Sequence, residues 1–444
     1  MEAGTGIVDL RGAVGGTTPL SSLTIGSAGT AKLNDATTTG AQSVTAGTIQ
    51  TNGVHTTTTS EITLTGTVVL QNSTTLSTGS GAGNITVTGA INGTSTGTQS
   101  LTLTAGTGDV LFQGSLGATT TLNSLTINSA RDVTFMGTVN TSGGLTQSSG
   151  TGTSTLKGGA VGGALSLTTN AITVATSTLT TVGTAVLNAQ NAVSFNADLN
   201  ATANTISILA NQDGAGTEGF TQASGVSITT TNNTSSAVAI TVNTSGGGTG
   251  GATLGTINAG STLGQVTVAV NGGGVTDSNG VGNNISAFKF VVTSGTGLVS
   301  LDTTVTEFDI VSTTGTVSIT NVLSTATTVT RMNTGTGNLT FNQSGGGKLN
   351  VIEMVATSGD VRIDNTVNVS VDEVGATGQT ITINSGGDIK EFGADSLVVD
   401  LLATTIVLNA VTDIGETTNF IEYTSINPII TNSGTGNVFV QSVP

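Results

Sequence analysis

A short apolar–polar–apolar cassette recurs about every twenty residues along this chain, and it is the feature that most constrains the fold. In the last third of the sequence, the steps between successive cassettes are 18, 22, 22 and 20 residues. A repeat of this length is typical of a solenoid, in which one coil cannot bury its own core and must stack on its neighbours. These cassettes are Val299-Ser300-Leu301, Val317-Ser318-Ile319, Leu339-Thr340-Phe341, Val361-Arg362-Ile363 and Ile381-Thr382-Ile383.

The outer residues of each cassette are Val, Leu, Ile or Phe, whereas the middle residue is Thr, Ser or Arg. Because successive side chains of a strand point to opposite faces, the outer residues face the interior and the middle residue faces solvent. Helical periodicity is nearly absent, and the abundant Gly and β-branched residues oppose helices. The sequence therefore predicts an all-β fold, a single-stranded right-handed parallel β-helix (β-solenoid) with about 18–24 residues per coil.

Composition excludes several other classes of protein. Hydrophobic residues make up 35 % of the chain and charged residues only 8 %, which is the reverse of the pattern of disordered chains. The net charge of −16 argues against binding of nucleic acid or of anionic membranes by bulk electrostatics. There is no cysteine, and hence no disulfide or thiol chemistry. No run of 18 apolar residues exists, so we expect no membrane insertion.

An internal duplication supports repeated coils. Residues 5–28 match residues 107–130 without gaps at a constant offset of 102, which predicts the same coil shape twice. From about residue 286, charges increase and the apolar strings lengthen. We therefore divide the chain into Thr/Gly-rich coils over 1–285 and more acidic coils over 286–444, with a C-terminal cap at 419–444.

Few residues suggest catalysis. Enzymes built on β-helices need clustered carboxylates with basic partners for proton transfer. The only histidine is His55, among threonines, and Asp360, Arg362 and Asp364 alternate on one predicted strand face. We interpret the alternating set as a surface ion-pair string and predict no enzymatic activity and no catalytic or cofactor-binding residue.

Fifteen of the 25 acidic residues lie in the last third of the chain, and we interpret them as a solvated face that keeps the protein soluble. Two groups offer the alternative of a Ca²⁺ site, because Ca²⁺ prefers carboxylate oxygens: Asp372 with Glu373, and Asp388 with Glu391 and Asp395. The glycine-aspartate nonapeptide of calcium-binding β-rolls is absent. We assign no metal ligand from the sequence.

Pairs of threonines raise a further alternative, since flat threonine arrays on β-solenoids can order water and bind ice. The offsets between successive pairs are 23 and 16 residues, which predicts that the pairs do not form a regular array. The pairs are Thr63/Thr65, Thr86/Thr88 and Thr102/Thr104.

Three sequence segments show similarity to a known family: LTLTAGTGDVLFQGSLG, LNSLTINSARDVTFMGTVNTSG and LTQSSGTGTSTLKG. They resemble the repeat regions of filamentous-haemagglutinin-like adhesins and of giant β-strand-repeat bacterial surface proteins. The resemblance covers most of residues 1–240 and fades toward 444. It implies a secreted β-helical protein of adhesion, biofilm or cell-envelope structure. The Asn-Pro-Asn-Gly or Asn-Pro-Asn-Leu motif of the family's secretion domain is absent, because Asn427-Pro428 is followed by Ile429.

These features together predict a structural, non-catalytic segment of a secreted bacterial cell-surface or extracellular-matrix protein, such as an adhesin stalk or a biofilm or envelope filament. The alternative is a glycan-binding or glycan-degrading module, although the absence of Trp and the single Tyr423 leave few rings for stacking on sugars. Expected partners are other copies, joined head to tail through the solenoid ends, and a host or neighbouring cell surface or glycan. Met1–Gly4 have no features of a signal peptide, so we expect a fragment of a longer protein.

Overall fold

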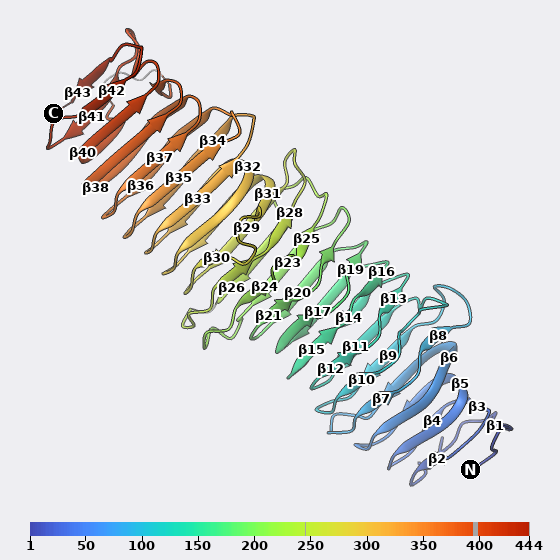
Figure 1. Cartoon of the computed structure of the whole chain (residues 1–444). Helices are drawn as coiled ribbons and strands as arrows, with labels where there is room; N and C mark the ends of the chain where they lie inside the picture. Colours follow the sequence, from blue (N-terminus) through green and yellow to red (C-terminus); the bar gives the residue numbers. More distant parts are fainter. Residues whose placement is uncertain (245, 394–397, 444) are drawn as a thin grey trace. The chain divides into compact units, whose positions relative to one another are not determined.

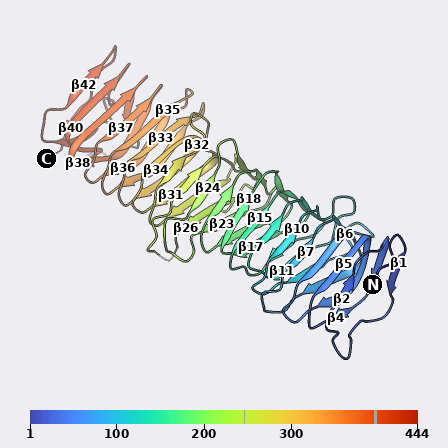
Figure 2. The ribbon, with the colours of Figure 1, turned by 60° about the horizontal axis from the view of Figure 1, so that its bottom comes forward.

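The computed structural model describes residues 1–244, 246–393 and 398–443. These residues form strands and no helix, and the strands pair in parallel in about 20 turns, which confirms the predicted β-solenoid. The chain divides into two compact units: unit 1 is Met1–Gln212 with Val226–Thr230, and unit 2 is Asp213–Gly225 with Thr231–Pro444. Within each unit the strands lie side by side with the loops at their ends (Figure 1), and the view in Figure 2 shows the same stacking.

Unit 1 is built mainly from short strands. They are β1 (Ile7–Leu10), β2 (Leu23–Ile25), β3 (Thr30–Leu33), β4 (Ala36–Thr37), β5 (Gln42–Thr56), β6 (Ile62–Ser77), β7 (Ile85–Val87), β8 (Ile91–Gly93), β9 (Leu101–Thr104), β10 (Val110–Phe112), β11 (Leu125–Ser129), β12 (Val133–Phe135), β13 (Val139–Thr141), β14 (Leu145–Gln147), β15 (Thr153–Leu156), β16 (Gly159–Val161), β17 (Leu165–Thr169), β18 (Ala171–Val174), β19 (Leu179–Thr181), β20 (Ala185–Ala189), β21 (Val193–Phe195), β22 (Leu199–Asn200), β23 (Ile206–Ala210) and β25 (Ser227–Thr229).

Unit 2 carries several longer strands. Its strands are β24 (Phe220–Gln222), β26 (Val238–Val242), β27 (Ala252–Leu254), β28 (Thr256–Asn258), β29 (Gln265–Val270), β30 (Val275–Asp277), β31 (Ile285–Ser294), β32 (Val299–Ser312), β33 (Val317–Val322), β34 (Thr327–Thr334), β35 (Leu339–Ser344), β36 (Leu349–Ala356), β37 (Val361–Asn365), β38 (Val369–Ser385), β39 (Ile389–Glu391), β40 (Leu401–Ala410), β41 (Ile421–Ser425), β42 (Ile430–Ser433) and β43 (Val440–Ser442).

Most of unit 1 is a coil of three strands per turn. One ladder runs through β7, β10, β12, β15, β18 and β21, and a second through β9, β11, β14, β17, β20 and β23. A third joins β13, β16, β19, β22 and β25. Each ladder is one face of the coil, and each strand pairs with the strand one turn later.

The cassettes of unit 2 stack in the predicted register. Val299 pairs with Val317, and Val317 pairs with Leu339. Leu339 pairs in turn with Val361, and Val361 with Ile381. The steps of 18 to 22 residues in the sequence are therefore single coils. All five residues are buried, as the alternation of apolar and polar residues predicts.

Aromatic side chains stack along the interior of unit 2. Phe308 lies between Phe290 and Phe341, with ring centroids 6.5 Å and 5.1 Å apart and edge-to-face geometry in both pairs. All three rings are fully buried. Such pairs contribute about 0.5–1.5 kcal/mol each beyond the burial of their surface, so the stack stabilises three consecutive coils.

The duplicated segments of unit 1 adopt the same turn. Gly15 and Gly117, at the offset of 102 residues, have φ angles of 71° and 67°. A Cβ atom on Gly15 would overlap the backbone oxygen of Thr37, and one on Gly117 would overlap that of Asn140. Because L-residues rarely adopt positive φ and neither site has room for a side chain, glycine is required at both positions. The prediction of one coil shape used twice is confirmed at this turn.

Two further expectations stay predictions. The division into two compact units does not test the predicted boundary between 1–285 and 286–444. It does not test the predicted cap at 419–444 either. In that last segment β41 pairs with β43 and β42 pairs with β40, so parallel pairing continues to Ser442. No helix in the described part of the chain is long and apolar enough to cross a membrane.

Candidate functional site

Three buried carboxylates meet inside unit 2. Glu391, Asp400 and Glu422 each contribute one oxygen, and these three oxygens all lie within 4.8 Å of one another. The side chains belong to residues that are only 7 %, 1 % and 1 % exposed. We refer to these three residues as the carboxylate cluster. Acidic side chains are almost never this buried unless they are paired, protonated or bound to a metal.

Three strands position the cluster. Glu391 is the last residue of β39, Asp400 directly precedes β40, and Glu422 is the second residue of β41. The backbone N–H of Asp400 donates to the carbonyl of Glu422 at 2.9 Å, and the N–H of Glu422 donates to Oδ2 of Asp400 at 2.8 Å. This double link places the two acids on neighbouring coils at adjacent positions.

One oxygen of the Glu422 carboxylate lacks a hydrogen-bond donor among the described residues. Its Oε2 atom is fully buried and accepts no hydrogen bond from the described residues. A buried carboxylate oxygen without a donor carries a desolvation penalty of about 1–3 kcal/mol or more. A bound cation would relieve that penalty, and carboxylate oxygens are the ligands that Ca²⁺ and Mg²⁺ prefer.

Of the described members of the predicted group Asp388, Glu391 and Asp395, only Glu391 belongs to the cluster. Asp395 lies outside the described residues. Asp388 accepts a hydrogen bond from the hydroxyl of Thr412 and pairs with Lys390 Nζ at 3.2 Å. The hydrogen bond from Thr412, then that from the backbone N–H of Asp413 and then the interaction with Lys390 lower the pKa of the Asp388 carboxyl. Asp388 is thus engaged in contacts other than those of the cluster, whereas Glu391 points into the coil.

Lys390 precedes Glu391 in β39, so its side chain lies on the opposite face of the strand. Its Nζ atom lies 2.8 Å from Oε1 of Glu416 and 3.2 Å from Oδ2 of Asp388. Hydrogen bonding to Glu416 and then to Asp388 raises the pKa of the Lys390 ammonium group. The basic residue next to the cluster in sequence is therefore committed to two other carboxylates on the surface.

The second predicted group, Asp372 and Glu373, does not belong to the cluster. Glu373 stacks in register on Glu353 of the preceding coil. All three acids line a surface hollow of about 510 Å³. Asn333 donates a hydrogen bond to Glu353. Among the described residues, the carboxylate cluster is the only group of three potential metal ligands close enough to share one ion.

His55 is a buried, neutral residue of unit 1. It is 2 % exposed, and its Nε2 atom lies 2.6 Å from the hydroxyl oxygen of Thr51. Desolvation by burial lowers the pKa of His55 to about 4, against a smaller opposing effect of Asp35. The imidazole is therefore uncharged at neutral pH and satisfied by a neighbour within its own strand, which is the environment of a structural histidine.

The alternating set on β37 forms a surface ion pair. Arg362 donates from Nε to Oδ2 of Asp364 at 2.7 Å and from a terminal nitrogen to Oδ1 at 2.9 Å. Oδ1 of Asp360 accepts the backbone N–H of Thr380 at 3.0 Å. The Arg362 side chain is 54 % exposed. The Arg362–Asp364 contact agrees with the interpretation as an ion pair, whereas Asp360 accepts a backbone N–H instead of pairing with Arg362.

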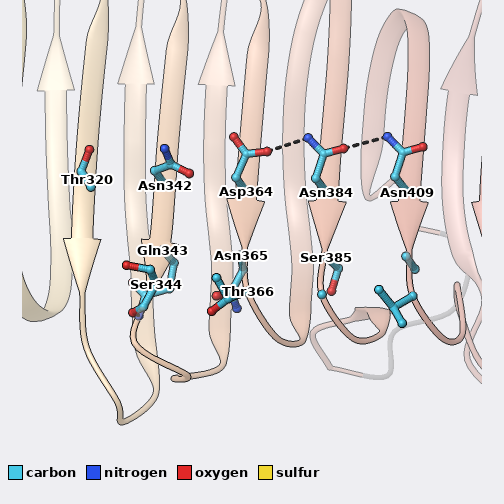
Figure 3. A pocket seen from close by; sticks show the side chains of 13 residues that line it. Thr320, Asn342, Gln343, Ser344, Asp364, Asn365, Thr366, Asn384, Ser385 and Asn409 are labelled. Carbon is cyan, nitrogen blue, oxygen red and sulfur yellow. Dashed lines mark hydrogen bonds between the residues drawn. The ribbon is translucent and has the colours of Figure 1, made fainter.

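A ladder of polar side chains follows the same face of unit 2 (Figure 3). Asn384 donates to Oδ1 of Asp364 at 2.6 Å, and Asn409 donates to Oδ1 of Asn384 at 2.7 Å. Asn432 extends the chain by donating to Asn409 at 2.6 Å. Beside the ladder lies a groove of about 470 Å³, lined also by Gln343. The sequence analysis missed this ladder, although the three asparagines recur at the coil period.

The threonine pairs do not form a regular array, as predicted. Thr63 stacks on Thr86, but Thr86 stacks next on Leu111. Thr102 belongs to a different ladder, where its partners are Thr75 and Thr126.

The sequence analysis also missed Asp400 and Glu422 as members of a site. The available signal was their separation of 22 residues, which equals one coil. The alternation of inward and outward residues does not predict that these acids are buried, because each lies next to another buried residue, Leu401 and Ile421 respectively.

Comparison of the chain with protein-family models, with curated proteins and with solved structures gave no match. The interpretation of the carboxylate cluster and of the polar groove therefore depends on their own geometry and chemistry.

Proposed function

We propose that this chain is a structural, non-catalytic segment of a secreted bacterial cell-surface or extracellular-matrix protein, such as an adhesin stalk or an envelope or biofilm filament. The observation that carries the proposal is the use of outward polar groups: they link one coil to the next. Arg131 donates to Asp109 of the preceding coil at 2.8 Å, and Asn409 does the same to Asn384 at 2.7 Å. Such cross-coil bonds strengthen a stack rather than prepare groups for a substrate.

Within this chain, the first and last of the described strands each have one unpaired edge, and we propose that these edges take part in assembly. Among the described strands, β1 pairs only with β3, and β43 pairs only with β41. Ile7 in β1 is 61 % exposed, and Ile430 in β42 is 48 % exposed. An unpaired edge with exposed apolar side chains is a template for a further parallel strand. Contacts between two different edges are heterologous, so they add copies without closing a ring.

Electron microscopy of the purified chain over a concentration series tests this proposal. We expect filaments that lengthen with concentration and are shortened by Ile7→Lys, which places a charge on the β1 edge. Val182→Lys is the matched control, because Val182 is 58 % exposed but belongs to unit 1 away from that edge. Single particles at every concentration, or equal effects of both variants, would contradict assembly through the edges.

The polar groove favours a second candidate, the binding of a linear glycan. Asn384 and Asn409 offer amide groups at successive coils along the groove, and regularly spaced amides suit the hydroxyl groups of a repeating polymer. A glycan array together with a screen for turnover distinguishes the candidates. The structural proposal expects neither binding nor turnover. Binding that is abolished by Asn409→Ala would favour the glycan module.

A further inference from the structure

We propose that Glu391, Asp400 and Glu422 form a binding site for one divalent cation and that the site prefers Ca²⁺ to Mg²⁺. The site would tie together β39, β40 and β41 of unit 2. The inference does not depend on the proposed structural role of the chain.

The spacing of the oxygens suits a single Ca²⁺ ion. One oxygen from each residue lies within 4.8 Å of the other two. Ca²⁺ binds oxygen at about 2.3–2.6 Å, so two ligands on opposite sides of one ion lie up to about 5 Å apart. Mg²⁺ gives up its water reluctantly and usually keeps several water ligands, so it is rarely held by protein carboxylates alone. A buried set of three protein carboxylates therefore suits Ca²⁺ better than Mg²⁺.

Because the cluster is buried, its negative charges require a compensating positive charge. Asp400 and Glu422 are each 1 % exposed and sit beside Leu401 and Ile421, which are completely buried. Several carboxylates brought together in an apolar interior cannot all remain ionised without compensation. The ligand set contains only oxygen, which favours Ca²⁺, Mg²⁺ or Mn²⁺ over Zn²⁺ or Cu²⁺, metals that favour nitrogen and sulfur ligands.

Glu422 supplies an independent indication of a ligand. Its Oε2 atom is completely buried, lies in the side chain that reaches the cluster, and accepts no hydrogen bond from the residues that the structure describes. The backbone N–H of Glu422 meanwhile holds Oδ2 of Asp400 at 2.8 Å. One carboxylate is therefore oriented by the backbone, while the other presents an oxygen whose partner a bound cation would supply.

Tyr423 makes the site directly observable. The chain contains one tyrosine and no tryptophan, and that tyrosine follows Glu422 in the sequence. Tb³⁺ occupies Ca²⁺ sites and emits when a nearby tyrosine is excited, so sensitised emission reports on this region of the chain. We expect saturable emission from the full chain with Tb³⁺, displaced by Ca²⁺ at concentrations about tenfold or more below those required of Mg²⁺.

Two variants distinguish cation binding at the carboxylate cluster from nonspecific attraction of cations to this negatively charged protein. Glu422→Gln removes the carboxylate whose oxygen lacks a donor, and we expect a loss of Tb³⁺ affinity of about tenfold or more. Glu416→Gln is the control, because Glu416 is exposed and pairs with Lys390. We expect its affinity to equal that of the unaltered chain. Absence of tyrosine-sensitised emission, or equal affinities of both variants, would overturn the proposal.

Thermal denaturation of the unaltered chain keeps the proposal testable even where Glu422→Gln fails to fold. A cation that binds only the folded state raises the midpoint of unfolding in proportion to the logarithm of its concentration. We expect the midpoint to rise with Ca²⁺ and to fall with a chelator. A midpoint indifferent to both would exclude the cation site.

Discussion

The backbone N–H of Glu422 donates to Oδ2 of Asp400 at 2.8 Å, and this bond joins two neighbouring coils where the buried carboxylates meet. At many positions in the ladders a backbone N–H of one coil meets a backbone carbonyl of the next. Here a carboxylate takes the place of that carbonyl, inside a coil whose adjacent residues Leu401 and Ile421 are completely buried. The interior of unit 2 therefore holds carboxylates at this level, in contrast to its aliphatic and aromatic stacks.

Asn321 is a buried hydrogen-bonding centre of unit 2, and we expect its removal to destabilise the surrounding coils. Its Nδ2 atom donates to the carbonyl of Val305 at 3.0 Å and to Oε1 of Gln343 at 2.8 Å. Its Oδ1 atom accepts from the N–H of Val305 at 2.9 Å. Asn321→Ala leaves these groups buried without partners, so we expect a loss of about 2–4 kcal/mol in the free energy of local unfolding, measured by amide hydrogen exchange.

Asn342→Ala is the matched control, because Asn342 is an exposed asparagine on the adjacent strand β35. A surface change of this kind shifts the free energy of unfolding by no more than about 0.5 kcal/mol. Equal losses in the two variants would contradict the role of Asn321 as a buried centre.

Gly117→Ala tests the repeated turn of unit 1. Gly117 has a φ of 67°, and an added Cβ would overlap the backbone oxygen of Asn140. We expect a loss of about 2–4 kcal/mol, because backbone strain and steric overlap act together. Gly378→Ala separates the two effects, since Gly378 has a φ of 75° with no atom within 4 Å of the added Cβ. It should lose only about 1–2 kcal/mol in thermal or hydrogen-exchange measurements. Similar losses would show that the close approach is unimportant.

His55 makes the stability of unit 1 depend on pH. Burial lowers the pKa of His55 in the folded state from 6.5 to about 4. Between these values the unfolded chain binds a proton that the folded chain does not, so stability falls as pH decreases. The contribution is complete above pH 6.5 and is lost toward pH 4, with a total of about 3 kcal/mol.

His55→Gln should remove that dependence. The midpoint of thermal unfolding, compared at pH 7 and pH 5, should decrease less in the variant than in the unaltered chain. An identical decrease in both proteins would show that other groups cause the acid sensitivity.

Arg362 makes a well-formed but exposed ion pair with Asp364, and we expect it to contribute little. Both donor–acceptor distances are below 3 Å, yet the Arg362 side chain is 54 % exposed. Solvent and salt screen such a pair, so Arg362→Ala should change the free energy of unfolding by less than about 1 kcal/mol, and by less still in high salt. A loss of more than about 2 kcal/mol in denaturation experiments would indicate a structural role that the surface geometry does not suggest.

Much of the fold could be predicted from local sequence because its causes are local. Alternation of side chains along a strand determines which residues of Val361-Arg362-Ile363 face inward, and the structure places them accordingly. The recurrence of the cassettes set the register of Val299 on Val317, because each coil needs a neighbour to cover its apolar face. The equivalent turns at Gly15 and Gly117 follow from the duplication, since a turn with positive φ is specified by residues next to it.

The carboxylate cluster was decided only by the tertiary structure. From the sequence, Asp388, Glu391 and Asp395 formed the acidic group, because they are close along the chain. In a solenoid, the residues that meet inside are one coil apart, and the length of each coil varies with its loops. Pairing of β40 with β41 brings Glu422 to Asp400 over 22 residues. Both acids lie next to a buried residue, so the alternation of inward and outward side chains does not hold there. The path of the backbone at this point directs both side chains inward.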